Sequence, residues 1–250
     1  MSVFEQLKKP KYDAAIITIL GDAGAGKTSL AASLPSPVFV MAEDGLASVP
    51  EDQRPDGWQL RSSEQLWEIF KALLQEEHDY KTVVIDSVSA LDEIFTKEIV
   101  SKEGKTNLAQ CAGGYGAGYK VLAGMHQRVG AAADAMKRKG LNVVYIAHAN
   151  VDRLELPDLD PYSRYVLKIT KDCQSSYVDK PDLVGFIRLQ TFLRGEDGER
   201  KKAISSGVRE LVCHATAANV SKNRFGITEP IVVEQGVNPF AEIIPALKGE

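Results

Sequence analysis

The sequence predicts an α/β fold with a mostly parallel central sheet, flanking helices and an antiparallel C-terminal extension. Two observations indicate it: short apolar segments alternate with helical patterns up to residue 150, and short segments separated by polar turns follow. Alternation of strands and helices implies crossover connections, which place helices on both faces of a parallel sheet. We expect the later segments to extend the same sheet and not to form a second domain.

The strands expected in the first part are apolar or β-branched and do not alternate with polar residues, as is typical of strands buried on both faces. They cover residues 14–20, 38–41, 82–86 and 142–148. Helical stretches between them cover residues 27–33, 63–77, 88–101 and 118–139. In the second stretch, Leu66, Ile69 and Leu73 recur at helical spacing after serines suited to an N-cap.

The extension begins after residue 150. Strands are expected at residues 164–170, 183–193 and 210–215, and the glycines of RGEDGER (194–200) favour a hairpin turn. The tail from residue 227 to 250 contains a strand-like piece, PIVVE, and a last helical turn near residues 240–247.

Composition narrows the class of protein. The chain has 250 residues, of which 44% are hydrophobic and 26% charged, as is usual for a globular protein. No apolar run approaches the roughly 18 residues of a membrane span, and the N-terminal MSVFEQLKKPKYD has no signal-peptide stretch, so we expect a cytoplasmic protein with no membrane contact. Cys111, Cys173 and Cys213 lack CxxC spacing, which argues against a disulfide framework or zinc site. The net charge of −4 restricts nucleic-acid contact to local loops.

Residues 21–28, GDAGAGKT, match the phosphate-binding pattern G-x-x-x-x-G-K-[ST]. Glycines let backbone N–H groups surround phosphates, Lys27 supplies charge for the β- and γ-phosphates, and the Thr28 hydroxyl can bind Mg²⁺. The strand before and the helix after the loop are the context that such a site needs. We expect ATP and Mg²⁺ as ligands. The expected nucleotide contacts are Gly21, Asp22, Ala23, Gly24, Ala25, Gly26, Lys27, Thr28 and Ser29.

Three other strands are expected to end in polar residues at the same edge of the sheet, where α/β proteins bind ligands. Asp86 ends the strand in KTVVIDS and would hold Mg²⁺ together with Thr28. Glu43 follows the strand in VFVMAEDGL and is the candidate to activate the attacking water, with Asp44 as its rival. His148 ends NVVYIAHAN; it is either a γ-phosphate sensor or a structural histidine.

Together these motifs resemble the RecA-like recombinase core over residues 13–226, and they are most similar to short phage-encoded ATP-binding proteins that include single-strand-annealing recombinases. The resemblance implies that Glu43 is catalytic and that His148 stands where the family usually has Gln. It also implies that Lys222 and Arg224, in AANVSKNRFG, reach the ATP of a neighbouring subunit. The implied domain organisation is one core over residues 1–226, which includes a short N-terminal segment 1–12, followed by a tail over residues 227–250.

In RecA-like proteins single-stranded DNA passes loops that follow two of these strands, and the resemblance points to two segments here. Residues 101–120 combine cations and aromatic side chains among glycines, which suits backbone contact and base stacking. Residues 149–165 carry further cations but are net acidic, which also suits a flap or a subunit contact. The candidate DNA-binding residues are Lys102, Lys105, Tyr115, Tyr119, Lys120, Arg153 and Arg164.

The sequence therefore predicts a Mg²⁺-dependent ATPase of DNA recombination. We expect it to assemble on single-stranded DNA as a filament or ring with ATP at subunit interfaces, and to anneal or pair strands in the cytoplasm of a bacterial host. A single-strand-binding or replication protein is a further expected partner. The alternative is an ATP-switched loader that acts on a replication protein, which the net acidic charge favours. A small-molecule kinase ranks lower because no arginine-rich lid follows the P-loop.

Overall fold

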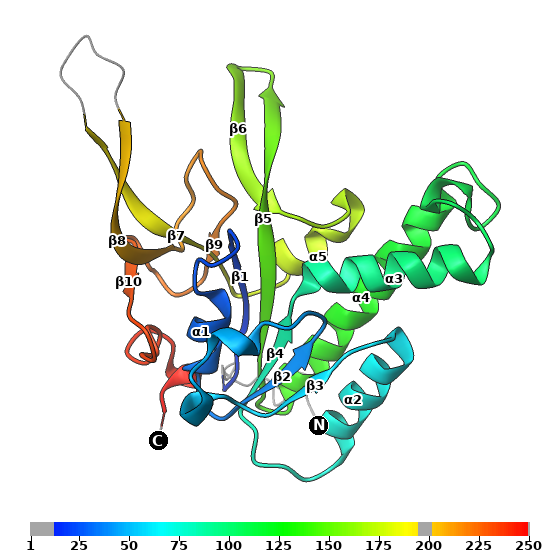
Figure 1. Ribbon diagram of the computed structural model, residues 1–250, viewed down its shortest axis with the longest axis horizontal. Helices are drawn as coiled ribbons and strands as arrows, with labels where there is room; N and C mark the ends of the chain where they lie inside the picture. Colours follow the sequence, from blue (N-terminus) through cyan, green and yellow to red (C-terminus); the bar gives the residue numbers. More distant parts are fainter. Residues whose placement is uncertain (1–12, 195–201, 250) are drawn as a thin grey trace, which may run out of the picture.

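The computed structural model of the chain describes residues 13–194 and 202–249 (Figure 1). Its strands are β1 (Ile16–Gly21), β2 (Pro37–Met41), β3 (Gly57–Gln59), β4 (Thr82–Asp86), β5 (Asn142–Leu156), β6 (Leu159–Leu167), β7 (Leu183–Arg194), β8 (Lys202–Val212), β9 (Lys222–Asn223) and β10 (Ile231–Val233). Its α-helices are α1 (Lys27–Ala32), α2 (Ser63–Gln75), α3 (Val88–Lys102), α4 (Ala117–Arg138) and α5 (Ser175–Val178). Short 3-10 turns include η4 (Leu108–Gln110), η5 (Lys171–Cys173) and η6 (Pro245–Leu247).

One sheet contains these strands, and its main path runs in the order β10-β8-β7-β1-β5-β4-β2-β3. Strand β1 lies between β5 and β7 and is parallel to both, and β4, β2 and β3 continue in parallel. Strands β8, β9 and β10 are antiparallel to their neighbours. The predicted α/β fold, with a mostly parallel sheet and an antiparallel C-terminal extension, is confirmed.

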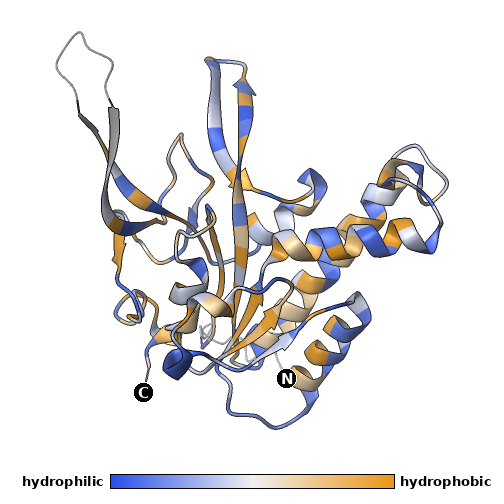
Figure 2. Cartoon of the chain, viewed as in Figure 1, coloured by the Kyte–Doolittle hydropathy of each residue, from blue (hydrophilic) through white to orange (hydrophobic). Residues whose placement is uncertain are grey.

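Both faces of the sheet are covered, as the absence of alternation in its strands predicts (Figure 2). Ile16 and Leu20 of β1 pack in the cluster that contains the buried sides of α2, α3 and α4. Ile17 and Ile19 face the other way and pack with α1 and the C-terminal segment. Within the described residues, no helix is both long and apolar enough to cross a membrane.

The residues after 226 are part of this packing. Strand β10 pairs with β8, and Phe240, Ile244 and Leu247 are buried against the α1 face of the sheet. The helical turn expected near residues 240–247 is the 3-10 turn η6. The hairpin turn expected in RGEDGER falls on residues 195–200, outside the described residues.

Three segments differ from their sequence-based predictions, and one of them is the strand expected at residues 164–170, which is β6 (Leu159–Leu167). Strand β5 does not end at His148 but continues to Leu156, and it pairs with β6, so the segment 149–165 is a β-hairpin and not a loop (Figure 1). Its charged residues obscure the strand, but pairing satisfies the backbone N–H and C=O groups whatever the side chains are. Strand β8 begins at Lys202, well before the expected residue 210, because β7 pairs with its polar first half.

A carboxylate ties the first residues of β1 to the elements beside them. The Asp182 carboxylate accepts a hydrogen bond from the Ile16 backbone N–H at 2.9 Å and forms ion pairs with Lys137 (2.6 Å) and Arg224 (2.9 Å). Burial raises the pKa of Asp182, but these three donors outweigh it, and the pKa lies below its usual value. One buried carboxylate therefore joins β1, α4 and the segment after β9.

Replacing Asp182 by Ala is expected to lower the free energy of unfolding by about 1–3 kcal/mol, because the buried Ile16 N–H loses its acceptor. Asp182→Asn keeps an acceptor oxygen and should lose less. Since the pKa of the carboxyl is lower in the folded chain than in the unfolded chain, its stabilisation is present above the unfolded pKa and is lost as the pH falls through the folded pKa. Urea unfolding at pH 7 and near pH 3, about where carboxylates become protonated, measures both effects. Equal stability of all three proteins at pH 7 would contradict this role.

Candidate active site

The parallel register brings the ends of β1, β2 and β4 and the middle of β5 to one edge of the sheet. Gly21 at the end of β1 is level with His148 of β5, and Met41 at the end of β2 is level with Asp86 at the end of β4. Asp86 is also level with Ile146 on β5. The side chains that follow these ends therefore converge, although they lie up to 127 residues apart in the chain, between Gly21 and His148.

The glycines of the P-loop have structural reasons to be glycines. Gly24 and Gly26 have φ angles of 75° and 98°, which favour glycine. At Gly21 a Cβ atom would lie 2.5 Å from the Ile187 carbonyl oxygen, so β7 passes too close for any side chain. The loop of residues 21–26 is therefore built by backbone conformation, as a phosphate cradle requires.

Lys27 lies at the start of α1 and turns back into this loop. Its ammonium group donates hydrogen bonds to the carbonyl oxygens of Gly21 (3.0 Å) and Asp22 (2.8 Å). Burial lowers the pKa of Lys27, and the charges of Asp86 and Glu43 oppose that shift. The ammonium group is thus placed where the loop would enclose a phosphate. Ser29, in the first turn of the helix, lines the same cavity.

Thr28 and Asp86 form the pair predicted to bind a metal ion. The Thr28 hydroxyl donates a hydrogen bond to Asp86 Oδ2 at 2.8 Å, and Asp86 is only 2% exposed. Burial raises the pKa of Asp86 to about 6. A hydroxyl and a carboxylate are hard oxygen donors of the kind that Mg²⁺ prefers, and a bound cation would favour the ionised carboxylate.

Gly45, which no sequence motif marks, leaves room beside this pair. A Cβ atom at Gly45 would lie 2.5 Å from Asp86 Oδ2 and 3.1 Å from Thr28 Oγ1. Its φ is −90°, so the backbone does not require glycine, and the requirement is one of space. The segment after β2 therefore passes directly over the two oxygen donors. The sequence shows only a glycine after AED, which is equally typical of a turn.

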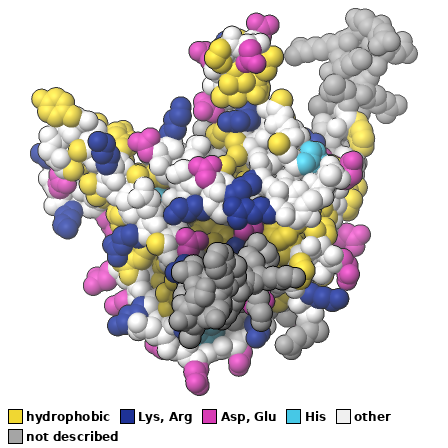
Figure 3. Space-filling model, turned by 180° about the vertical axis from the view of Figure 1, so that it is seen from behind, with side chains coloured by type: hydrophobic (Ala, Val, Ile, Leu, Met, Phe, Trp, Pro, Cys, Tyr) yellow, Lys and Arg dark blue, Asp and Glu magenta, His cyan; other side chains and the backbone are white. Residues whose placement is uncertain are grey.

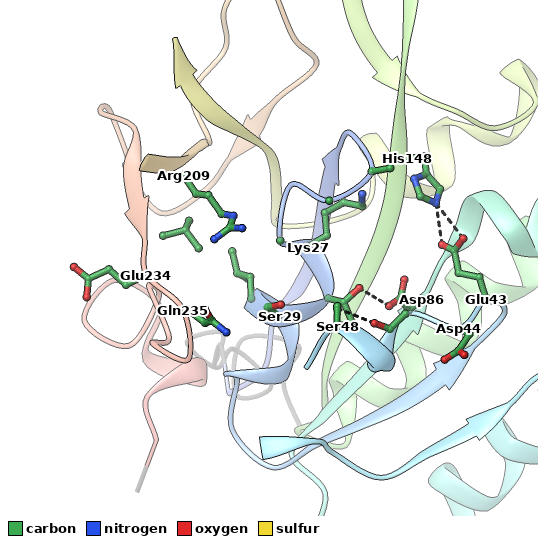
Figure 4. Close-up of a pocket in the computed structure, with 17 residues that line it drawn as sticks. Lys27, Ser29, Glu43, Asp44, Ser48, Asp86, His148, Arg209, Glu234 and Gln235 are labelled. Carbon is green, nitrogen blue, oxygen red and sulfur yellow. Dashed lines mark hydrogen bonds and ion pairs between the residues drawn. The ribbon is translucent and has the colours of Figure 1, made fainter. Parts of the chain in front are cut away.

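Glu43 and His148, which the sequence proposes separately, contact each other. The His148 Nε2 atom lies 2.9 Å and 3.1 Å from the two carboxylate oxygens of Glu43, and Ser89 Oγ accepts the His148 backbone N–H. The hydrogen bond with His148 is the main cause that lowers the pKa of Glu43, against the effect of burial. In Figure 4 the Asp44 carboxylate points away from Lys27 and His148.

The cavity at this edge has a volume of about 540 Å³ and extends well beyond the predicted residues. On one side it is lined by Glu43, Asp86 and His148, and on the other by Arg209 of β8 and by Val233, Glu234 and Gln235 at β10 (Figure 4). No pattern in the sequence marks these C-terminal residues as part of a site: Arg209 precedes the strand expected at 210–215, and Val233 and Glu234 belong only to the strand-like piece PIVVE.

Lys222 and Arg224 lie away from this cavity. Strand β9 pairs with the first residues of β7, level with the start of β1, whereas the P-loop follows the end of β1. Lys222 is level with Thr18 and Arg224 with Ile16, so three to five residues, at roughly 3.3 Å each, separate them from the level of Gly21. Arg224 pairs with Asp182, its side chain is 57% exposed, and Lys222 donates a hydrogen bond to the Asp179 carbonyl. The structure does not bring these two residues to the P-loop of their own chain.

The first predicted DNA segment forms an arm at the α3–α4 connection. Glu103 accepts the Ala112 backbone N–H, and Gly118 packs so tightly on Leu108 that a Cβ atom would lie 2.1 Å from its carbonyl oxygen. Figure 3 shows hydrophobic and Lys or Arg side chains together on this arm. Tyr115, with a φ of 52°, is fully exposed. Lys102, Lys105, Tyr119 and Lys120 are exposed as well.

The second predicted DNA segment is the β5–β6 hairpin, and its cations have acidic neighbours. Arg164 stands opposite Asp152 in the strand pair. Arg153 Nε lies 3.8 Å from Glu155, and both side chains are exposed. The structure thus places the two segments on separate projections, and acidic residues accompany the cations of the hairpin.

A second polar cluster, Asp92, His126 and Cys173, lies between α3, α4 and η5. Both ring nitrogens of His126 already have partners, Asp92 Oδ1 at 3.0 Å and the Tyr177 hydroxyl at 2.6 Å. Burial, with the Asp92 charge, raises the pKa of the Cys173 thiol to about 12, so it is not a thiolate. The cluster is a hydrogen-bond network that joins the helices behind the site.

The chain matches a known protein family and is similar to solved structures. A family model described as an AAA domain matches residues 13–225. The chain is similar to a solved KaiC-like protein, PH0186, from the hyperthermophilic archaeon Pyrococcus horikoshii OT3, with 12% identity, a TM-score of 0.47, and coverage of 90% of this chain and 87% of that chain. It is also similar to a second solved structure, an ATPase domain, with 11% identity, a TM-score of 0.47, and coverage of 89% of this chain and 81% of that chain. No protein of curated function matches the sequence.

The family match begins at the first described residue and ends one residue after Arg224, so it includes the P-loop, Glu43, Asp86 and His148 but not the cavity residues 233–235. It accounts for the P-loop, and it indicates ATPase activity. The chain belongs to the AAA domain family of P-loop ATPases.

Proposed function

We propose that this protein hydrolyses ATP with Mg²⁺ and acts in DNA recombination, as an oligomer on single-stranded DNA that promotes annealing or pairing of strands. The observation that carries the ATPase proposal is the contact of Glu43 with His148 beside the P-loop. A nucleoside triphosphate fits the site because the cavity joins a backbone cradle, a buried ammonium group and two oxygen donors for a cation.

In this proposal each residue at the edge has one task. Lys27 leaves its carbonyl partners and binds the β- and γ-phosphates, while Thr28 and Asp86 hold Mg²⁺, which neutralises phosphate charge when bound. Glu43 accepts a proton from the attacking water, since its low pKa keeps it ionised. His148 orients that carboxylate and, through the same ring, can respond to the γ-phosphate.

Lys222 and Arg224 act on the nucleotide of a neighbouring subunit in this proposal. Neither residue lines the cavity of its own chain, and both lie level with residues 16–18 of β1, before that strand reaches the P-loop, which supports a role in trans. A cation supplied by a neighbour stabilises the charge of the phosphoryl-transfer transition state and makes hydrolysis depend on assembly.

The arm between α3 and α4 is the proposed contact for single-stranded DNA. Exposed Tyr115 and Tyr119 offer stacking surfaces, and Lys102, Lys105 and Lys120 offer charge for the backbone. The β5–β6 hairpin supports the alternative function instead, an ATP-switched loader of a replication protein. It is rich in acidic residues and exposes Val151, Leu156 and Leu159, which suits a protein surface better than DNA.

The proposal is tested by ATP hydrolysis and DNA binding in one preparation. Lys27→Ala should abolish hydrolysis, and Glu43→Gln should bind ATP but hydrolyse it at least ~100-fold more slowly. Tyr115→Ala with Lys105→Ala should weaken binding of single-stranded DNA about tenfold at low salt, while Lys71→Ala, an exposed lysine on α2, serves as the control. Failure of the wild type to bind DNA at low salt with nucleotide present would overturn the recombination role, and recovery of a replication protein would then favour the loader.

His148→Ala is expected to shift the acidic limb of the pH–rate profile to higher pH. The hydrogen bond from His148 is the largest cause of the low pKa of Glu43, so its loss raises that pKa and protonates the base at a higher pH. Turnover at neutral pH should also fall about tenfold, because Glu43 loses its orientation. His148→Gln can still donate a hydrogen bond to Glu43, so it should partly restore both the position of the acidic limb and the turnover at neutral pH. Profiles of kcat from about pH 3 to 8, which include the ordinary range of carboxyl groups, measure this, and an unmoved acidic limb would refute it.

Gly45→Ala is expected to raise the Mg²⁺ concentration that hydrolysis requires by about tenfold, because its Cβ would displace the Asp86 carboxylate. Binding of nucleotide without Mg²⁺ should change little. Gly124→Ala is the matched control, since a Cβ atom there meets nothing within 4 Å. Titration of ATPase activity with Mg²⁺ checks the effect; an identical titration for both variants would show that the space at Gly45 is not needed.

A further inference from the structure

The roles proposed so far use only half of the cavity. Lys27, the Thr28–Asp86 pair and the Glu43–His148 pair place the terminal phosphate and the water on one side. The cavity continues past Gly26 and Ser29 to Arg209, Val233 and Gln235 (Figure 4). Since a nucleoside triphosphate is an elongated molecule, its base can occupy this second half when its terminal phosphate lies in the first.

Arg209 is held against the P-loop by the sheet. It lies level with Leu189 of β7 and with Val233 of β10. A Cβ atom at Gly26 would lie 3.1 Å from both Cδ and Nε of Arg209, so the side chain runs directly along the loop. Figure 4 shows its guanidinium group directed into the cavity and toward the P-loop.

The guanidinium group of Arg209 has a buried donor atom without a hydrogen-bond partner among the described residues. This donor is the Nε atom. By contrast, the neighbouring Arg188 is paired with Glu210 at 2.7 Å. A buried donor without a partner is destabilising, and a planar cation at the wall of a cavity can be stabilised by a ligand that lies against it.

We propose that Arg209, Val233 and Gln235 form the subsite for the base of the bound nucleotide, and that the base is adenine. This inference rests on the proposed nucleotide function of the same cavity. A guanidinium plane stacks on the face of an aromatic base. The buried Val233 supplies apolar contact, and the Gln235 side-chain amide offers the donor and acceptor that match the N6 and N7 edge of adenine.

The subsite gives the C-terminal extension a role in the chemistry of the core. Arg209 comes from β8, and Val233 and Gln235 come from β10 and the residue two after it. The antiparallel strands then complete a site whose phosphate half belongs to the parallel strands. The base is bound in cis, whereas the charge from Lys222 and Arg224 is proposed to act in trans.

The test compares ligands with and without a base, by calorimetric titration of ATP and of tripolyphosphate in the presence of Mg²⁺. Arg209→Ala should weaken ATP binding about tenfold and leave tripolyphosphate binding within about twofold, because only ATP has a base to stack. Arg209→Lys should weaken ATP binding as much as Arg209→Ala does, since lysine keeps the positive charge but lacks the planar group that stacks on the base. Arg138→Ala, at the exposed end of α4, is the control and should change neither affinity.

Gln235→Ala should lower the preference for ATP over GTP about tenfold, because the amide reads the edge of the base. Equal losses for ATP and tripolyphosphate in Arg209→Ala, or rescue by Arg209→Lys, would show a phosphate contact and overturn the base subsite. Unchanged ATP affinity in both Arg209 variants would overturn it too. Wild-type protein that binds ATP without hydrolysing it would overturn the proposed function and leave this inference standing.

Discussion

The parallel pairing of β1 with β5 and β7 is the constraint on which the site depends. It places Gly21 level with His148, and the pairing of β2 with β4 places Met41 level with Asp86. A shift of one residue in any of these pairs would turn the following side chains to the opposite face of the sheet. Alternate side chains of each strand pack in two different cores, so such a shift would disrupt close packing on both faces. The chemistry at the edge is therefore positioned by the hydrophobic core.

The parts of the site that lie in local patterns can be predicted from the sequence, and the parts that depend on register cannot. A P-loop has its own spacing, and a buried strand that ends in Asp86 is visible in the short segment KTVVIDS, so both are predictable. Arg209 is not, because an arginine in a polar strand acquires its position only when β8 pairs with β7 and β10. The role of Gly45 cannot be predicted for a related reason. A side chain at this position would collide with Asp86, which lies 41 residues later in the chain.

At the β5–β6 hairpin the sequence-based prediction is wrong, because the charged composition of the segment does not indicate its strand conformation. The charged residues after His148 favour a loop, yet β5 continues past the edge that holds the candidate site and into the hairpin. One strand therefore carries the partner of Glu43 and then the projecting surface. The Lys168 backbone N–H donates a hydrogen bond to the His148 carbonyl oxygen, and this bond holds both ends of the hairpin beside the site. Polar residues on a strand show which surface faces water and do not argue against the strand itself.

The two edges of the sheet differ in chemistry, and this difference limits how subunits can meet. If Lys222 and Arg224 act on a neighbour, the edge that carries them must face the P-loop edge of the next subunit. Such a contact joins unlike surfaces, and contacts of that kind generate closed rings or open filaments. Arg224 would have to exchange its ion pair with Asp182 for the phosphates of the neighbour. The Arg224 side chain is 57% exposed and can turn toward a neighbour, but Asp182 is buried, so the exchange removes one partner from a buried carboxylate. Asp182 keeps Lys137 and the Ile16 N–H as partners, so β1 remains anchored while Arg224 leaves.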